Sequence, residues 1–296
     1  MTSTTLHEPG DSQLVIHAPH LDESSRAALL VRLDVGSTRA LLADDGPTLR
    51  VAARHDETGL PEIAREAGCD AAIVSRGASL DAFGLLAMDM DSTVITIECI
   101  DELAAEAGAK PRVAAITERA MRGEIDFAES LRQRVRLLDG LPCDRLQKVH
   151  DERLRFSSGA ARLVQAARAA GLHTLLVSGG FTWFTERVSA ALGIAEAHGN
   201  RLGVRGNALD GTLDGPILDA AGKAAAVRAA AARLGLRPDQ VMVIGDGAND
   251  LAMMAEAGTS IAYHAKPVVR AKASLAIDHG GLDTVLSWFP PRPRSA

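Results

Sequence analysis

The sequence contains few aromatic residues and few cysteines. Aromatic side chains make up 3% of its 296 residues, and the net charge is −6. Nucleic-acid-binding surfaces usually carry a basic stripe with interleaved aromatics, so no nucleic-acid partner is expected. The three cysteines, Cys69, Cys99 and Cys143, form no C-x-x-C pair. This odd number indicates a reducing compartment and argues against a zinc site, so we expect a cytoplasmic protein.

Long hydrophobic runs are also absent. No stretch of about 18 apolar residues occurs, so we expect no membrane span. The beginning of the chain, MTSTTLHEPGDS, lacks the charged and apolar regions of a signal peptide. With 47% hydrophobic and 24% charged residues, the composition is typical of a globular protein. A chain of this length can bury the cores of two domains.

Residues 13–80 predict a small α+β domain. Runs typical of strands occur at 13–19, 39–43, 49–53 and 70–75, and patterns typical of helices occur at 23–33 and 60–67. The order strand, helix, strand, strand, helix, strand is the ferredoxin-like pattern. Residues 1–12 are polar and residues 290–296 are rich in proline, so we expect both ends to be disordered.

Residues 81–289 predict an α/β domain of a different kind. Continuous apolar runs separated by helical stretches are typical of a parallel sheet covered on both faces. These runs lie at 84–89, 173–179, 241–247, 259–265 and 274–280. The helical block at 98–171 is too long for one crossover helix, so we expect a helical cap inserted at about 98–158, while 198–216 predicts a β-hairpin. The predicted fold is a three-layer α/β/α Rossmann-like core with a parallel sheet, a helical cap and an N-terminal ferredoxin-like domain.

Polar residues follow several of the predicted core strands. Asp89, Ser178 and Asp246 each stand at a strand's carboxyl end, where open parallel sheets bind their ligands. Asp91 points to the same side as Asp89 in extended backbone. Several carboxylates at one site repel one another unless a cation joins them. Asp89 and Asp246, with waters and a phosphate oxygen, would suit Mg²⁺.

The same sheet edge offers groups that bind phosphate. Ser178 and the amide of Gly179 can hydrogen-bond phosphoryl oxygens, and Lys223 adds a positive charge. This set favours phosphoryl transfer with a carboxylate nucleophile. Each motif alone has a simpler explanation: a turn for D-x-D and for VSGG, a hairpin or calcium loop for GDGAND, and a solvated helix start for Lys223. The GDGAND spacing is not that of an EF-hand.

Four motifs together resemble the haloacid-dehalogenase superfamily of aspartyl-phosphate enzymes: DMDST, LLVSGG, Lys223 and GDGANDLAMMAEAG. The segments ITIECIDELAAEAG, ITERAMRGEIDFAESLRQRVRLLDGL and IAYHAKP resemble, more closely, the phosphoserine phosphatase family. The resemblance covers about residues 84–278. Residues 13–80 resemble, far more weakly, the ACT-like regulatory domain of longer family members.

The resemblance implies a magnesium-dependent hydrolysis of O-phospho-L-serine, the last step of serine biosynthesis. Asp89 would attack phosphorus, and Asp91 would be the proton donor. The metal ligands would be Asp89, the backbone carbonyl of Asp91 and Asp246, while Asp250 would orient metal-bound water.

The resemblance also implies the substrate-binding residues. Ser178, Gly179, Lys223 and Asn249 would hold the phosphoryl group, Glu98 the ammonium group and Arg134 the carboxylate, while Met121 and Phe127 would line the cap side. Two of these have alternatives. An acid such as Glu98 in a first helical turn also stabilises the helix dipole, and Arg132 competes with Arg134 on the sequence alone.

Two other functions stay open from the sequence. One is a phosphatase or phosphotransferase that acts on another small phosphorylated amino acid or alcohol, because the phosphate motifs do not define the rest of the substrate. The other is a regulatory binding protein whose ACT-like domain does the work beside a silent core. A homodimer and an amino-acid effector at the N-terminal domain are possible partners in either case.

Overall fold

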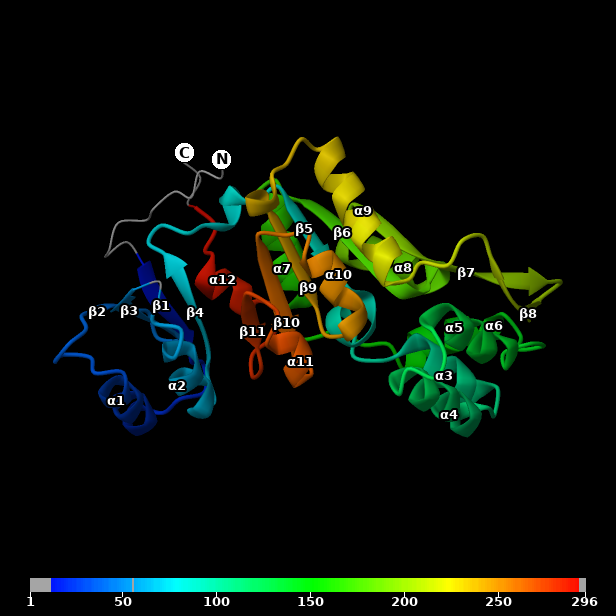
Figure 1. Ribbon diagram of the computed structural model, residues 1–296, viewed down its shortest axis with the longest axis horizontal. Coiled ribbons are helices and arrows are strands. Elements are labelled where there is room, and N and C mark those ends of the chain that lie inside the picture. The colour runs from blue at the N-terminus through cyan, green and yellow to red at the C-terminus, as the bar shows by residue number, and fades with distance from the viewer. Residues whose placement is uncertain (1–11, 55, 293–296) are drawn as a thin grey trace.

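The structure is a computed structural model that describes residues 12–54 and 56–292. It has three parts (Figure 1): an N-terminal sheet with two helices, a central sheet with helices on both faces, and a helical cap at the opposite end. The remaining residues, including most of both predicted disordered ends, lie outside the described residues.

The N-terminal part has the predicted order of elements. These are β1 (Ser12–His17), α1 (Glu23–Arg32), β2 (Leu41–Asp44), β3 (Thr48–Ala53), α2 (Leu60–Glu66) and β4 (Asp70–Ser75). The sheet is antiparallel in the order β2-β3-β1-β4. The prediction of a ferredoxin-like strand and helix order is therefore confirmed, whereas a regulatory role for this part stays a prediction.

The two faces of this sheet pack into different hydrophobic cores. Leu14 and Ile16 belong to a core shared with residues of α1 and α2. Val15 points to the other face and joins the main core of the protein, as do Ala72 and Val74 of β4. Helix α12 (Thr284–Trp288) contacts β1 and β4, and Trp288 is fully buried there. The N-terminal part is thus packed directly on the rest of the molecule.

The central sheet has seven strands in the order β11-β10-β9-β5-β6-β7-β8. Their bounds are β5 (Leu85–Met88), β6 (His173–Phe181), β7 (Glu196–Arg205), β8 (Ala208–Asp214), β9 (Val241–Gly245), β10 (Thr259–Tyr263) and β11 (Leu275–Ile277). All neighbours pair in parallel except β7 and β8. The predicted hairpin is present, but its first strand continues the central sheet because β7 also pairs with β6.

Helices cover both faces of this sheet. One face carries α7 (Ala160–Ala169), α8 (Thr182–Leu192) and α12, and the other carries α9 (Ala220–Arg233), α10 (Leu251–Met254) and α11 (Pro267–Arg270). Along β5, Leu86 and Met88 pack on the first face, while Leu85 and Ala87 pack on the second. Both sets are fully buried. This explains why the strand is a continuous apolar run rather than an alternating one.

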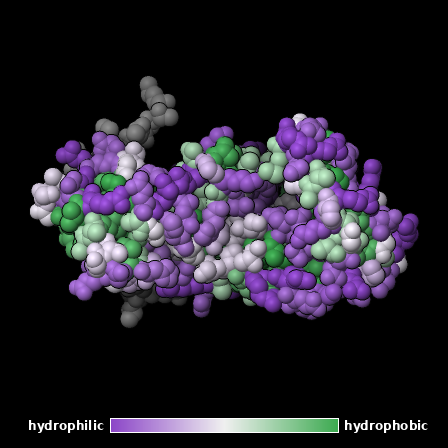
Figure 2. All heavy atoms as spheres, turned by 90° about the horizontal axis from the view of Figure 1, so that it is seen from below, coloured by the Kyte–Doolittle hydropathy of each residue, from purple (hydrophilic) through white to green (hydrophobic). Residues whose placement is uncertain are grey.

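The cap consists of four helices between β5 and α7: α3 (Cys99–Glu106), α4 (Lys110–Met121), α5 (Phe127–Arg136) and α6 (Asp144–Glu152). This agrees with the predicted insertion and leaves α7 as the crossover helix. No helix in the described part of the chain is long and apolar enough to span a membrane. The face seen in Figure 2 is mostly hydrophilic, with hydrophobic residues in separate patches.

The structure differs from the expected disorder where the chain enters and leaves the fold. Ser12 is 5% exposed and begins β1. Near the other end, the carbonyl of Pro290 accepts the Leu80 N–H at 3.4 Å, and the Arg292 N–H donates to Asp81 at 2.8 Å. These two hydrogen bonds hold residues 290–292 against the short helical turn Leu80–Ala82.

Asp70 links the two sheets. It is 3% exposed, and its carboxylate accepts the N–H groups of Asp278 at 2.7 Å, His279 at 3.1 Å and Gly280 at 2.6 Å. A Cβ atom on Gly280 would lie 2.9 Å from that carboxylate and 2.2 Å from the Thr284 hydroxyl. Only glycine therefore lets the loop after β11 approach so closely.

Asp70→Ala should destabilise the protein strongly. The change leaves three backbone N–H groups without their acceptor, and hydrogen bonds to a charged group contribute about 1.5–3 kcal/mol each. We expect the free energy of unfolding to fall by roughly 3 kcal/mol or more, measured by urea denaturation. Asp45→Ala, in the exposed turn between β2 and β3, is the matched control. Equal stability of the two variants would contradict the role of Asp70 as the acceptor that links the two sheets.

Candidate active site

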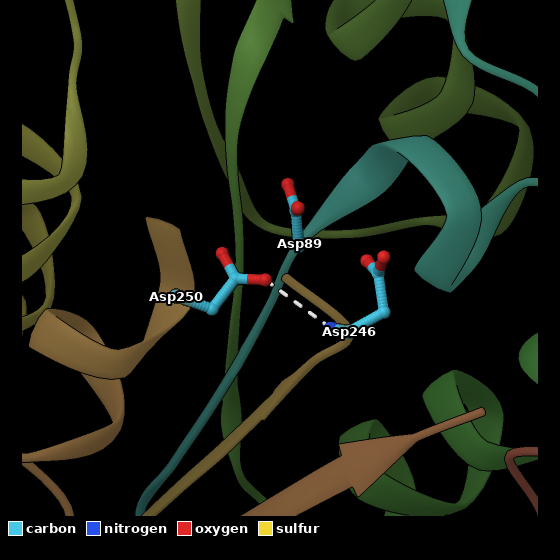
Figure 3. A group of neighbouring side chains, drawn as sticks. All are labelled: Asp89, Asp246 and Asp250. Carbon is cyan, nitrogen blue, oxygen red and sulfur yellow. Dashed lines mark hydrogen bonds between the residues drawn. The ribbon is translucent and has the colours of Figure 1, made fainter. Parts of the chain in front are cut away.

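Three carboxylates meet at the carboxyl ends of two neighbouring strands. Asp89 follows β5 and Asp246 follows β9, which pairs with β5 in parallel. Asp250 lies in the next turn, so that one carboxylate oxygen from each of the three residues falls within 4.8 Å of the others. Figure 3 shows the Asp89 and Asp246 side chains directed to the same side, and the Asp250 carboxylate hydrogen-bonded to the Asp246 N–H.

Lys223 lies behind these acids as their buried counter-charge. Its Nζ is 2.8 Å from Asp89 Oδ1 and 2.8 Å from Asp250 Oδ1, and the residue is 1% exposed. Burial alone would lower the pKa of Lys223, but Asp89 and Asp250 outweigh this and raise it. Lys223 is therefore a fixed positive charge.

Hydrogen bonds leave selected oxygens of the acids available. Asp250 uses both oxygens, because Oδ1 accepts from Lys223 and Oδ2 from the N–H groups of Asp246 and Gly247. Asp89 Oδ1 accepts from Lys223 and from the Met90 N–H at 2.7 Å, while no hydrogen bond among the described residues uses Oδ2. Asp89 Oδ2 is thus left free for a ligand, whereas both Asp250 oxygens are used to hold Lys223 and the Asp246–Gly247 backbone.

The acid cluster fits a hard divalent cation. Burial and Asp250 raise the pKa of Asp89, and burial raises the pKa of Asp246 to about 6. Three carboxylates share the single ammonium group of Lys223, so the cluster has room for a further positive charge. Asp246 Oδ1 accepts the Thr93 hydroxyl at 2.8 Å, and its second oxygen has no hydrogen bond in the described part. Oxygen donors of this kind suit Mg²⁺ and similar metals.

Asp91 has the properties of a proton donor. Its Oδ1 is buried and has no hydrogen-bond partner in the described chain. Burial and the nearby Glu98 carboxyl raise the pKa of Asp91 to about 7. Near neutral pH this group can therefore both release and accept a proton.

The last residues of β6, Ser178–Phe181, form a cradle that suits an anion. Ser178 is 1% exposed, and its Oγ accepts the Gly180 N–H at 2.9 Å. The serine hydroxyl hydrogen is therefore free to donate to a ligand. A Cβ atom on Gly180 would lie 2.7 Å from Asp91 Oδ2, so glycine is required for this close approach.

A cavity of about 130 Å³ joins the core acids to the cap. It is lined by Asp89, Asp91, Glu98, Ile100, Phe127, Leu131, Arg134, Ser178, Gly179, Gly180, Phe181, Asp246 and Asn249. Arg134 Nε donates to the Ser130 carbonyl at 3.3 Å, while its terminal nitrogens have no hydrogen-bond partner among the described residues. Glu98 as a whole residue is exposed to solvent. Its carboxyl group is nevertheless partly desolvated by the surrounding atoms, and this desolvation raises the pKa of Glu98. The cap thus presents one positive and one negative group to the cavity.

The structure brings together all the predicted site residues except Met121. That residue ends α4, is 68% exposed and does not line the cavity, and the turn that follows it is also exposed. Lys223 and Asp250 contact Asp89 and Asp246 from behind rather than lining the cavity. Of the two arginines, Arg134 lines the cavity. The Arg132 side chain is 52% exposed, and its guanidinium lies 3.7 Å from the Glu129 carboxylate.

Sequence reasoning missed Asn200, which lies in β7. It is 2% exposed, and its Nδ2 donates to the Gly179 carbonyl at 2.8 Å while its Oδ1 accepts the Leu218 N–H at 2.7 Å. Asn200 therefore ties the end of β6 that carries Ser178 to the segment before α9, the helix of Lys223. No local spacing marks this residue, since its partners are distant in the chain. Thr93, which orients Asp246, was also missed, although it stands inside the motif DMDST.

Comparisons with known proteins agree with this geometry. Residues 86–255 match the haloacid dehalogenase-like hydrolase family, and the chain belongs to that family. A "Phosphoserine phosphatase" of Albidiferax ferrireducens is 51% identical over 72% of this chain and 92% of its own length.

Two solved structures also match the N-terminal part. A HAD family hydrolase of Salmonella enterica serovar Typhi has a TM-score of 0.85 at 30% identity, over 95% of this chain and 99% of that one. A probable phosphoserine phosphatase of Vibrio cholerae has a TM-score of 0.80 at 34% identity, over 94% and 85% of the two chains.

Asn200→Ala should weaken hydrolysis of a phosphate monoester. The Gly179 carbonyl loses its donor, so the peptide that carries the Gly180 N–H is no longer held against Ser178. A lost hydrogen bond of about 1–3 kcal/mol corresponds to roughly 5- to 150-fold in kcat/KM. Asn207→Ala, exposed in the β7–β8 turn, should change little. Unchanged kinetics in a folded Asn200→Ala protein would contradict the role.

Proposed function

We propose that this hydrolase converts O-phospho-L-serine to L-serine and phosphate with Mg²⁺, as the last step of serine biosynthesis. The observation that carries the proposal is one small cavity with Asp89 and Ser178 on the core side and Glu98 and Arg134 on the cap side. A phosphoryl group suits the first pair, and an ammonium and a carboxylate suit the second. Relatives that bear the name phosphoserine phosphatase support the same substrate.

In the first step of the proposed mechanism, Asp89 Oδ2 attacks phosphorus. The bond between phosphorus and the serine oxygen breaks, and Asp91 donates its proton to that oxygen. Lys223 orients Asp89 and, together with the metal, would keep it ionised, while Ser178, Gly179 and Asn249 bind the phosphoryl oxygens. Asp89 and Asp246, together with the backbone carbonyl of Asp91, would hold Mg²⁺, which would neutralise charge between the carboxylates and the phosphoryl group.

In the second step, the aspartyl phosphate on Asp89 is hydrolysed. Asp91, now ionised, takes a proton from a water molecule as the water oxygen attacks phosphorus. The bond between Asp89 and phosphorus breaks, and phosphate leaves. The raised pKa of Asp91, about 7, suits a group that must act first as an acid and then as a base.

The cap supplies selectivity, since any monoester presents the same phosphoryl group to the core. Arg134 can bind a carboxylate through two parallel hydrogen bonds from its terminal nitrogens. Glu98 can pair with an ammonium group, and Phe127 closes the cavity beside Gly179, where a Cβ atom would lie 3.1 Å from the Phe127 ring. A cavity of about 130 Å³ favours a compact substrate.

The complete acid cluster disfavours a regulatory protein with a silent core. A different small phosphorylated amino acid or alcohol remains the alternative substrate class. An amino-acid effector at the N-terminal part, a homodimer and a cytoplasmic location remain predictions.

Asp89→Asn should abolish the activity while the fold survives. The amide keeps the shape of the side chain but loses the charge that attacks phosphorus, so release of phosphate from phosphoserine with Mg²⁺ should fall to near background. Beryllium fluoride with Mg²⁺ should bind the wild type and not the variant. Substantial turnover by Asp89→Asn, with deamidation excluded by mass spectrometry, would overturn the nucleophile assignment.

Arg134→Ala should damage turnover of phosphoserine and spare phosphoethanolamine, which has no carboxylate. Loss of a partner to a charged group in a closed site costs about 2–5 kcal/mol, or roughly 30- to several-thousand-fold in kcat/KM. Arg132→Ala, on the same helix but outside the cavity, is the matched control. If Arg134→Ala lowers kcat/KM equally for both substrates, Arg134 does not bind the carboxylate.

A further inference from the structure

Ser92 adopts a backbone conformation that its side chain makes unfavourable. Its φ is 58° and its ψ is −1°, in the left-handed region. In the described part of the chain, only Asp34 and His264 share a positive φ without being glycine. Glycine adopts this conformation without steric cost, so a serine here needs a reason beyond the shape of the turn.

The Ser92 hydroxyl makes one specific contact that glycine would lose. Its Oγ donates to Glu98 Oε1 at 2.7 Å. Ser92 follows Asp91 in the turn Met90–Val94 of the core, and Glu98 begins the first cap helix, α3. The backbone N–H of Ser92 also donates to the Ile97 carbonyl at 3.3 Å, which closes the connecting loop. The Ser92 hydroxyl thus links the turn that carries Asp91 to the cap.

The chemistry of this bond suits recognition of a cation. Glu98 lines the cavity, and the hydrogen bond uses one of its two carboxylate oxygens. A hydroxyl donor orients a carboxylate without cancelling its charge, whereas an arginine or lysine in this place would neutralise it. The second oxygen, with the negative charge retained, is left for a ligand.

We propose that Ser92 is a positioning residue for selectivity: it holds Glu98 in the orientation that binds the substrate's ammonium group. The inference rests on the proposed function, because it concerns how the site selects phosphoserine over phosphate monoesters that lack an amine. Ser92 itself does not line the cavity, so it acts through Glu98.

The backbone strain allows stability and selectivity to be separated. Ser92→Gly removes the hydroxyl and relieves the strain, so its melting temperature should equal or exceed that of the wild type. Its kcat/KM for phosphoserine should fall about tenfold or more, mainly through KM, as expected for a hydrogen bond to a charged group. Turnover of 3-phosphooxypropionate, which keeps the carboxylate and lacks the amine, should change less than about twofold.

Two further variants complete the test. Ser92→Thr keeps the hydroxyl but is β-branched, so it should lower the melting temperature and restore the preference for phosphoserine. Thr96→Ala, exposed in the same loop, should leave the preference unchanged.

The outcomes separate this inference from the proposed function. A Ser92→Gly protein with wild-type selectivity, or with equal losses on both substrates, overturns the positioning role while the function stands. Wild-type protein with no preference for phosphoserine over 3-phosphooxypropionate overturns the proposed function, and the positioning role with it.

Discussion

The buried ion pairs of Lys223 hold the core site together. Two carboxylates, Asp89 and Asp250, lie 2.8 Å from one ammonium group at a depth where an unpaired charge would be strongly unfavourable. Lys223 comes from α9, Asp89 from the end of β5 and Asp250 from the turn after β9. The packing of α9 against the sheet is therefore a condition for the site, because a displaced helix would leave two buried acids without their partner.

The division between core and cap follows from what each part can offer a ligand. In the core, Asp89, Ser178 and Asp246 lie at the carboxyl ends of three neighbouring strands, where they suit a phosphoryl group and a divalent cation. The cap adds Glu98 and Arg134, which carry opposite charges and line the side of the cavity that faces the core acids. In the proposed mechanism, the chemistry thus depends on a sheet edge, whereas selectivity depends on two helices of the inserted cap, α3 and α5. The Ser92–Glu98 hydrogen bond directly connects the core and the cap.

The N-terminal part is joined to the core by more than a linker. Its sheet buries Val15, Ala72 and Val74 in the main core, and Asp70 accepts three N–H groups from the loop after β11. That loop also contacts His264, whose Nε2 lies 2.9 Å from the Gly280 carbonyl. His264 follows β10 at the same sheet edge as the acids, so the N-terminal part is packed beside the edge that carries the site.

The sequence by itself determined the order of elements and the core site, because both depend on local patterns. Apolar runs of strand length mark β5, β6 and β9, and the motifs stand directly at their ends, so parallel pairing alone brings Asp89, Ser178 and Asp246 together. Tertiary structure decided what depends on packing and on backbone conformation. Asn200 reaches Gly179 across a strand pair, and Met121 ends a helix that leaves it exposed. The Ser92 hydroxyl reaches Glu98, six residues further on, within a turn in which Ser92 has a positive φ. Residue spacing encodes none of these, because a strand pairing, a helix's exposure and a backbone angle all depend on the folded chain.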